Sequence, residues 1–206
     1  MKRKLQFGFL LILLSSLASS QTFQGGISGG LNAARIDGDG HELYGKLGLN
    51  AGAFVAREII PEILFWQLEL KYTSRGKYNL ERDWGGTVIG KDLIDLRYIE
   101  MPFSVHYFFS EKIQAEFGIA PDVLIKQYWI DENGDYTESS GYDLRRFGIT
   151  ALIGANYFIR PELAVGIRFN YSLIPFYKFS AYAIRYRDSG WFHDVLSLNL
   201  RYYFSR

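Results

Sequence analysis

Along most of this chain, apolar and polar side chains alternate at every second position. The closing segment LSLNLRYYFSR shows this plainly, since Leu196, Leu198 and Leu200 are separated by Ser197 and Asn199. A period of two is typical of a β-strand whose two faces meet different surroundings. Five more segments show the pattern and two glycine-rich segments show it more weakly: 63–76, 98–109, 112–120, 146–158 and 162–173, then 22–34 and 46–58. The sequence therefore predicts eight strands.

The connections between these strands alternate in length. Short ones are predicted near 59–62, 110–112 and 159–162, and long ones over 35–45, 75–95, 127–143 and 174–194. An antiparallel up-and-down barrel with both termini at one end has tight turns at one rim and long loops at the other. A sandwich with Greek-key crossings has no reason for such an alternation. We therefore predict an all-β fold, an eight-stranded antiparallel up-and-down β-barrel.

The alternation alone leaves open which row of side chains faces the inside. In a soluble barrel the apolar row fills the core, whereas in a transmembrane barrel the apolar row contacts lipid. The strands reach the roughly 9–11 residues that cross hydrocarbon at a tilt. The glycines fall mostly in the polar row, where a narrow lumen leaves the least room. We therefore predict a transmembrane barrel, with a soluble lipocalin-like barrel as the alternative.

Aromatic side chains are concentrated where the predicted strands meet the short turns. They are Phe65, Trp66, Tyr107, Phe108, Phe109, Tyr157, Phe158, Tyr202, Tyr203 and Phe204. Amphipathic rings favour the headgroup level of a membrane. We therefore predict that these side chains form an interfacial girdle at one end of the barrel.

The beginning of the chain is typical of a secretory signal peptide. A basic MKRK start precedes an apolar run that is too short to span a bilayer, and small residues lead to a cleavage position after Ser20. We expect residues 1–20 to be the signal peptide and 21–206 to form the barrel domain. The chain has no cysteine, so no disulfide stabilises it. A net charge of +1, with acids and bases mixed, gives no electrostatic case for nucleic acid.

Five segments carry a resemblance to a known family. They are LELKYTSRGKY, DLRYIEMPFSVHYFF, FGIAPDVLIK, GIRFNYSL and LSLNLRYYFSR, and the resemblance extends over nearly all of 21–206. With these segments the chain resembles the PorT-type outer-membrane β-barrel proteins of Gram-negative bacteria. The resemblance implies an integral barrel of the outer membrane and implies no particular activity. Such barrels commonly end on an aromatic residue, whereas here Phe204 is followed by Ser205 and Arg206.

Eight strands enclose a lumen just wide enough for their own side chains. The polar rows supply charged candidates for this interior: Glu69, Lys71, Glu100, Glu116, Arg146, Arg168 and Arg201. Because an unpaired buried charge is costly, we predict that these residues form ion pairs that plug the lumen. A path for ions or small solutes is the alternative.

Ser104, His106 and Glu100 share one row and superficially supply a nucleophile, a base and an acid. Residues two apart on a strand are separated by about 6.6 Å, which we take as too far for a direct side-chain hydrogen bond. We therefore predict no catalytic residues, and a lipid-modifying enzyme is the alternative. His41 and His193 fall in predicted loops without metal-ligand spacing, so we expect neither a metal nor a cofactor.

The last long loop has the aromatic and arginine composition of a binding hot spot. Its candidates are Phe176, Tyr177, Phe179, Tyr182, Arg185, Tyr186 and Trp191. This loop either binds a partner or packs on itself above the strands, and both alternatives stay open. We predict a non-enzymatic outer-membrane protein that contacts lipid and acts as a structural element, or as an accessory subunit that binds an envelope protein in a secretion or uptake complex.

Overall fold

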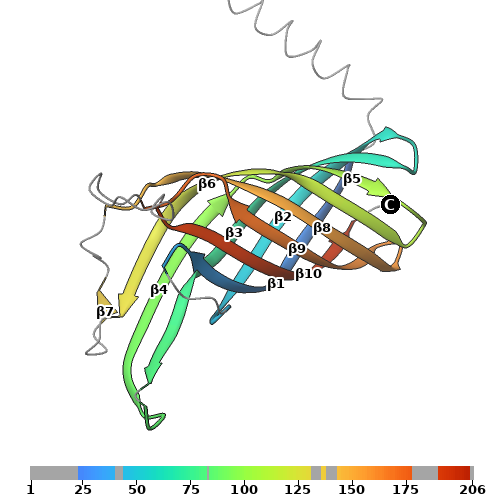
Figure 1. Ribbon diagram of the computed structural model, residues 1–206. Helices are drawn as coiled ribbons and strands as arrows, with labels where there is room; N and C mark the ends of the chain where they lie inside the picture. Colours follow the sequence, from blue (N-terminus) through green and yellow to red (C-terminus); the bar gives the residue numbers. More distant parts are fainter. Residues whose placement is uncertain are drawn as a thin grey trace, which may run out of the picture.

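The computed structural model describes residues 23–39, 44–82, 84–130, 136–137, 143–177 and 190–204. Its strands are β1 (Phe23–Asp37), β2 (Lys46–Ile60), β3 (Leu64–Arg82), β4 (Val88–Glu100), β5 (Phe103–Phe108), β6 (Ile113–Ile130), β7 (Tyr136–Thr137), β8 (Phe147–Arg160), β9 (Leu163–Ser172) and β10 (Phe192–Tyr203). Eight antiparallel wall strands close into a barrel, in which β4 and β5 together form one wall strand (Figure 1). The two-residue β7 pairs with the outer end of β6. The predicted eight-stranded barrel is confirmed.

Strands β4 and β5 are separated at Met101 and Pro102. Both pair with β3 on one side and with β6 on the other. Pro102 has no N–H to donate, so the regular ladder is interrupted there. The Pro102 carbonyl still accepts the Glu69 N–H at 2.9 Å, and the Met101 N–H donates to the Pro121 carbonyl at 2.9 Å. The wall therefore stays continuous through the break.

The barrel closes where the first and last strands pair. Strands β1 and β10 run antiparallel from Gly26 opposite Tyr203 to Asp37 opposite Phe192. The tight turns at 61–63, 109–112 and 161–162 lie at the same end as the start of β1 and the end of β10. These are the three short connections that the sequence predicts.

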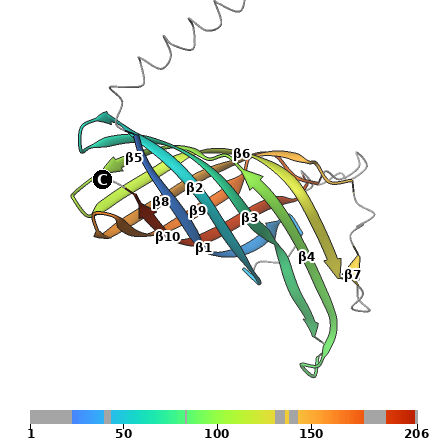
Figure 2. The ribbon, with the colours of Figure 1, turned by 180° about the vertical axis from the view of Figure 1, so that it is seen from behind.

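The prediction of a long loop over 75–95 is wrong. Strands β3 and β4 remain paired out to Arg82 opposite Val88, and β6 runs beside β4 as far as Ile130. The β3–β4 hairpin projects beyond the rest of the rim, away from the tight turns (Figure 2).

A local irregularity explains why the alternation did not reveal this extension. Ser74 and Arg75 are consecutive and both buried, and Gly76 follows with a φ of 143°. A Cβ at Gly76 would collide with the Ile94 carbonyl oxygen of the paired strand. The period of two is lost over these three residues, although the strand itself continues.

The orientation of the two rows distinguishes the membrane barrel from the soluble one. Leu198, Phe103 and Ile167 lie outside with 53%, 49% and 57% of their surface exposed, whereas Glu69 and Arg168 are 1% exposed inside. An exposed apolar belt around a closed barrel is stable against hydrocarbon and unfavourable in water. Among the residues described, no helix is long and apolar enough to cross a membrane.

The predicted aromatic girdle is only partly correct. Adjacent aromatic residues on a strand point to opposite faces. Trp66, Tyr107, Tyr157, Tyr202 and Phe204 face outward with Phe109, whereas Phe65, Phe108, Phe158 and Tyr203 are buried inside and pack with Phe54 and Ala164. Six of the ten aromatic residues therefore lie on the outer surface as the girdle, and the other four close the lumen beside it.

The small lumen makes inward glycines sensitive to substitution, and a neighbouring pair on β1 tests this. A Cβ at Gly30 would collide with the Leu198 carbonyl oxygen and lie 2.7 Å from the Asn199 side chain, whereas at Gly29 its nearest neighbour would be 3.9 Å away. We predict that Gly30→Ala destabilises the barrel by about 1–3 kcal/mol through overpacking. Gly29→Ala is the matched control and is expected to be neutral or to stabilise by up to about 1 kcal/mol. Urea unfolding in lipid vesicles measures the stability of both variants. Equal effects of the two substitutions would contradict the close packing around Gly30.

Candidate functional site

The centre of the lumen holds a charged cluster that joins opposite walls. Arg168 on β9 donates to Glu116 on β6 at 2.7 and 3.1 Å and to Glu69 on β3 at 3.1 Å. Arg201 on β10 lies 2.9 Å from the second oxygen of Glu116. Strands β3 and β9 are four positions apart in a ring of eight, so the Arg168–Glu69 pair crosses the full width of the lumen. The Ser28 hydroxyl donates a further hydrogen bond to Glu69.

A second cluster lies next to the first, toward the long loops. Arg75 on β3 contacts Glu100, lies 3.1 Å from Asp122 on β6, and donates to the Thr150 hydroxyl on β8 at 3.2 Å. The Arg75 guanidinium also stacks over the Tyr98 ring at 4.3 Å.

The central charges balance in number. The described carboxylates of the two clusters are Glu69, Glu100, Glu116 and Asp122. They are equalled in number by the cations Arg75, Arg168 and Arg201 together with Lys71, which is buried on β3 between the clusters' residues Glu69 and Arg75 in the sequence, and all eight side chains are nine-tenths or more buried. Mutual neutralisation is what permits so many charges inside a narrow barrel.

Apolar layers close the lumen on both sides of these clusters. At the tight-turn end, the rings of Phe54, Phe65, Phe108, Phe158 and Tyr203 form one layer. At the long-loop end, a second layer consists of Ile36, Ile94, Leu96, Tyr98, Trp129, Leu144 and Phe176. The Tyr98 hydroxyl and the His193 Nε2 lie 2.9 Å apart and again join opposite walls, from β4 to β10. In the part of the barrel that the structure describes, side chains therefore occupy the lumen from the lower apolar layer to the upper one.

Six of the seven predicted lumen residues lie inside this interior. They are Glu69, Lys71, Glu100, Glu116, Arg168 and Arg201. The placement of Arg146 in the lumen is wrong, because its side chain is exposed just before β8, outside the ladder. Sequence reasoning missed Arg75 and Asp122 as members of the set. Arg75 is at the end of the polar row of the predicted strand, where that strand overlaps the predicted loop, and is not among the predicted lumen charges. Asp122 follows Pro121, which is not typical of a strand interior.

The geometry around His106 differs from the predicted one. The Ser104 hydroxyl and His106 Nε2 lie 2.9 Å apart, and His106 Nδ1 lies 2.9 Å from Gln114 Oε1. The prediction that the two side chains are too far apart for a hydrogen bond is wrong. The spacing of two residues separates the Cα atoms, whereas an imidazole that leans along the strand bridges the distance. His106 Nε2 also lies 3.7 Å from a carboxylate oxygen of Glu116.

His193 also lies elsewhere than predicted. It belongs to β10 and is buried, with its ring stacked on Phe176 at 4.1 Å. His41 lies outside the described residues. Among the residues that the structure describes, no group of His, Asp and Glu side chains is arranged to hold a metal ion.

The loop candidates divide into buried and undescribed residues. Phe176 is 5% exposed within the upper apolar layer, so its prediction as an exposed binding residue is wrong. Tyr177 and Trp191 are half-buried against the same layer and form a β-bridge with each other. Phe179, Tyr182, Arg185 and Tyr186 lie outside the described residues. At the base of this loop, Phe176, Tyr177 and Trp191 therefore pack on the barrel, as the second of the two alternatives predicts.

Comparisons with known proteins agree with this architecture. A family model for the outer membrane protein beta-barrel domain matches residues 18–178. Among curated proteins, no sequence matches the chain significantly.

Two solved structures share the fold. The attachment invasion locus protein Ail of Yersinia pestis, crystallised with the heparin analogue sucrose octasulfate, is 14% identical with a TM-score of 0.50, over 88% of this chain and 99% of Ail. Neisserial surface protein A is 14% identical with a TM-score of 0.52, over 86% of this chain and 96% of that protein. Because the family model covers most of the sequence and the barrel matches these structures, the chain belongs to the outer membrane protein beta-barrel domain family and is located in the outer membrane.

Proposed function

We propose that this protein is a non-conducting, non-enzymatic barrel that serves the outer membrane as a structural element or accessory subunit and binds an envelope protein on its loop side. The filled lumen is the observation that carries the proposal. An ion pair from Arg168 to Glu69 crosses the interior, and an apolar layer lies at each end. With the interior occupied, the loops and the outer surface are what the protein presents to other molecules. Membership of the PorT-type group within the family is part of the proposal and rests on the five sequence segments quoted above.

The burial of Ser104 and His106, and not a lack of suitable catalytic side chains, supports the proposal that the protein is not an enzyme. Ser104 and His106 form a hydrogen-bonded pair, the arrangement that activates a serine nucleophile. Their exposed fractions are 0% and 1%, so a lipid substrate has no route to the hydroxyl. Burial of this pair favours a packing role for it.

The β3–β4 hairpin is the most prominent surface on the loop side. It extends beyond the barrel rim, and Trp84 at its tip is fully exposed (Figure 2). Tryptophan is enriched in the energetic centres of protein interfaces. We place partner binding on this hairpin together with the last long loop, whose candidates Tyr177 and Trp191 are half-buried at its base.

Site-specific photo-crosslinking tests partner binding in intact cells. A photoreactive residue in place of Trp84 is expected to capture one envelope protein in stoichiometric yield. The same residue in place of Phe109, which is also exposed but lies in a tight turn at the opposite end, is the matched control and is expected to capture none of it. Equal capture from both positions, or capture from neither, would leave a purely structural role.

A pore is the second candidate function, and planar-bilayer recording distinguishes it from a closed barrel. We predict no discrete channel openings for the purified wild-type protein, because the described residues of the charged clusters and the two apolar layers occupy the lumen. A porin recorded in the same bilayers is the positive control, because its openings show that inserted channels are detected. Openings that disappear when Glu116 is replaced by Gln would contradict a closed lumen and support the pore.

We further propose that export removes residues 1–20, which lie outside the described residues. The intact mass of protein purified from outer membranes tests this, and a mass that begins at Gln21 is expected.

A further inference from the structure

One arginine of β2 lies within the apolar outer face of the barrel, close to the tight turns. Phe54 and Ala56 on this strand are buried inside the barrel. The residues between and beyond them, Val55, Arg57 and Ile59, therefore lie on the outer side. Val55 and Ile59 are exposed apolar residues, at 42% and 54%. Because they lie two positions to either side of Arg57, this cation is part of the belt that contacts lipid.

Two aromatic rings from the neighbouring strands flank the Arg57 side chain on the same outer face. In the ladders, Arg57 is opposite Phe23 on β1 and opposite Trp66 on β3. The guanidinium lies over the Phe23 ring, 6.0 Å from its centroid. The centroids of the Phe23 and Trp66 rings are 6.1 Å apart, with the ring planes at 81°. Contact with an aromatic face stabilises a guanidinium and leaves its N–H groups available to an acceptor.

Arg57 has no carboxylate partner in the part of the chain that the structure describes. The residues that adjoin Phe23 and Phe204 in the sequence, 1–22 and 205–206, include no Asp or Glu. A charged side chain that contacts hydrocarbon is costly unless it extends to a counter-charge or to water at the interface. Arg57 therefore needs an anionic acceptor from outside the chain, at the level where hydrocarbon meets the headgroups.

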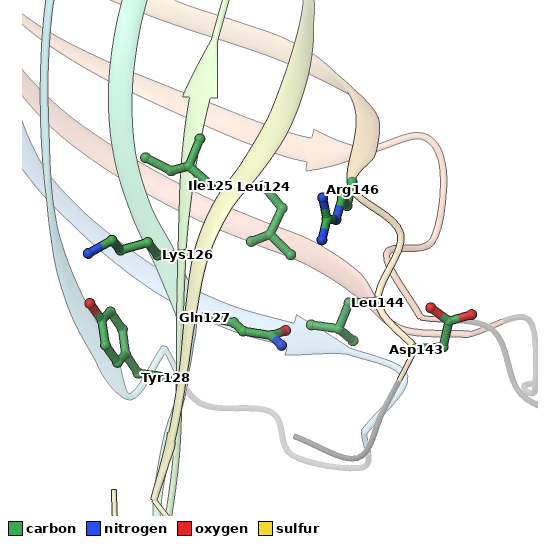
Figure 3. A pocket seen from close by; sticks show the side chains of 8 residues that line it. All are labelled: Leu124, Ile125, Lys126, Gln127, Tyr128, Asp143, Leu144 and Arg146. Carbon is green, nitrogen blue, oxygen red and sulfur yellow. The ribbon is translucent and has the colours of Figure 1, made fainter. Parts of the chain in front are cut away.

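Cations near the long-loop end of the barrel are arranged differently. Arg35 on β1 is neutralised by Asp194, at 2.7 Å. Lys126 extends from one side of β6, whereas Arg146 lies on the other side, so these two side chains do not face one site (Figure 3). Arg57 combines an outward position, two flanking rings and no acidic partner among the described residues.

We propose that Arg57 binds the phosphate of a phospholipid in the inner leaflet of the outer membrane, with Phe23 and Trp66 lying beside the start of its acyl chains. The short turns of bacterial outer-membrane barrels lie on the periplasmic side, so this end of the belt is in the inner leaflet. A guanidinium donates paired hydrogen bonds to phosphate oxygens, and the apolar surroundings favour a lipid over a free anion. The site lies on the lipid-facing wall and is independent of the loop-side partner binding proposed above.

Native mass spectrometry from octyl glucoside micelles tests the site, with equal amounts of phosphatidylglycerol and diacylglycerol as probes. The two lipids carry the same acyl chains, and only the first has a phosphate. The wild type is expected to retain phosphatidylglycerol preferentially. A cation near a membrane surface contributes about fivefold in affinity, so Arg57→Gln is expected to weaken phosphatidylglycerol binding about fivefold and to leave diacylglycerol binding unchanged. Arg57→Lys is expected to retain most of the binding, because an ammonium also binds phosphate.

The matched control is Arg160→Gln, which removes the same side chain from an exposed position at the tight-turn end of β8. This variant is expected to bind phosphatidylglycerol like the wild type, and the gel mobility of unheated samples verifies that all variants are folded. Wild-type binding by Arg57→Gln, or equal losses in the two glutamine variants, would overturn the site. Displacement of the lipid by equimolar inorganic phosphate would assign Arg57 to a free anion and would overturn the lipid assignment.

Discussion

Replacing Arg168 with alanine is expected to lower the free energy of unfolding by about 3–5 kcal/mol, because removal of one partner leaves buried charges without compensation. Arg168 holds Glu116 and Glu69, and all three side chains are 1% exposed. In the variant, Glu116 keeps its contact with Arg201, whereas Glu69 keeps only the Ser28 hydroxyl as a direct hydrogen-bond donor. The cost therefore arises mainly at Glu69, in the middle of the lumen.

Arg146→Ala is the matched control for this prediction. The same side chain is removed from an exposed position, where an effect within about 0.5 kcal/mol is expected. Urea unfolding in phosphatidylcholine vesicles, followed by tryptophan fluorescence, measures both variants. The double variant Glu69→Gln with Arg168→Ala is expected to regain part of the loss, because it removes the stranded charge. Equal stability of the two arginine variants would contradict a buried cluster.

The interior also explains how such a barrel tolerates many buried charges. Each carboxylate contacts a cation from another wall strand, so the network cross-links the wall, from the neighbouring strands β3 and β4 to the opposite strands β3 and β9. Inward glycines provide the space for the larger side chains. A Cβ at Gly154, for example, would lie 2.7 Å from a carboxylate oxygen of Glu116.

The sequence was sufficient for the fold because one signal, the period of two, recurs in every wall strand. Gln67, Glu69 and Lys71 are inward because Leu68 and Leu70 are outward, and this holds without knowledge of any neighbour. The three tight turns followed from the same pattern, since the alternation stops and restarts within a few residues.

The wrong predictions concern residues whose place in the barrel is not determined by the period-of-two alternation. At Ser74, Arg75 and Gly76 the alternation breaks although the strand continues, so the β3–β4 hairpin was missed and Arg75, at the end of the predicted polar row, was not counted among the lumen charges. The partners in a cluster were also beyond sequence reasoning, because they depend on which strands face each other across the lumen. Arg146 shows the converse error, since it precedes an alternating segment but lies outside the ladder.

The prediction that adjacent aromatic residues at the strand ends all belong to the girdle was wrong in an informative way. A cluster at strand ends was correctly associated with the membrane interface, but a strand sends neighbouring side chains to opposite faces. Phe158 lies inside, with ring centroids 5.3 Å from Phe108 and 5.5 Å from Tyr203, whereas Tyr157 lies outside with half of its surface exposed. One sequence pattern thus supplies both the girdle and the lower seal of the lumen.

These two roles predict different costs for two neighbouring substitutions. Phe158→Ala removes a buried ring from the lower layer and is expected to destabilise the barrel by about 3–5 kcal/mol, since the rigid wall cannot collapse into the cavity. Tyr157→Ala removes a ring of similar size from the girdle and is expected to cost about 1 kcal/mol or less, because lipid refills the space. Urea unfolding in vesicles measures the difference, with gel mobility as the check on folding. A larger cost for Tyr157→Ala than for Phe158→Ala would show that interfacial anchoring, rather than the internal seal, is the main contribution of these aromatic residues to stability.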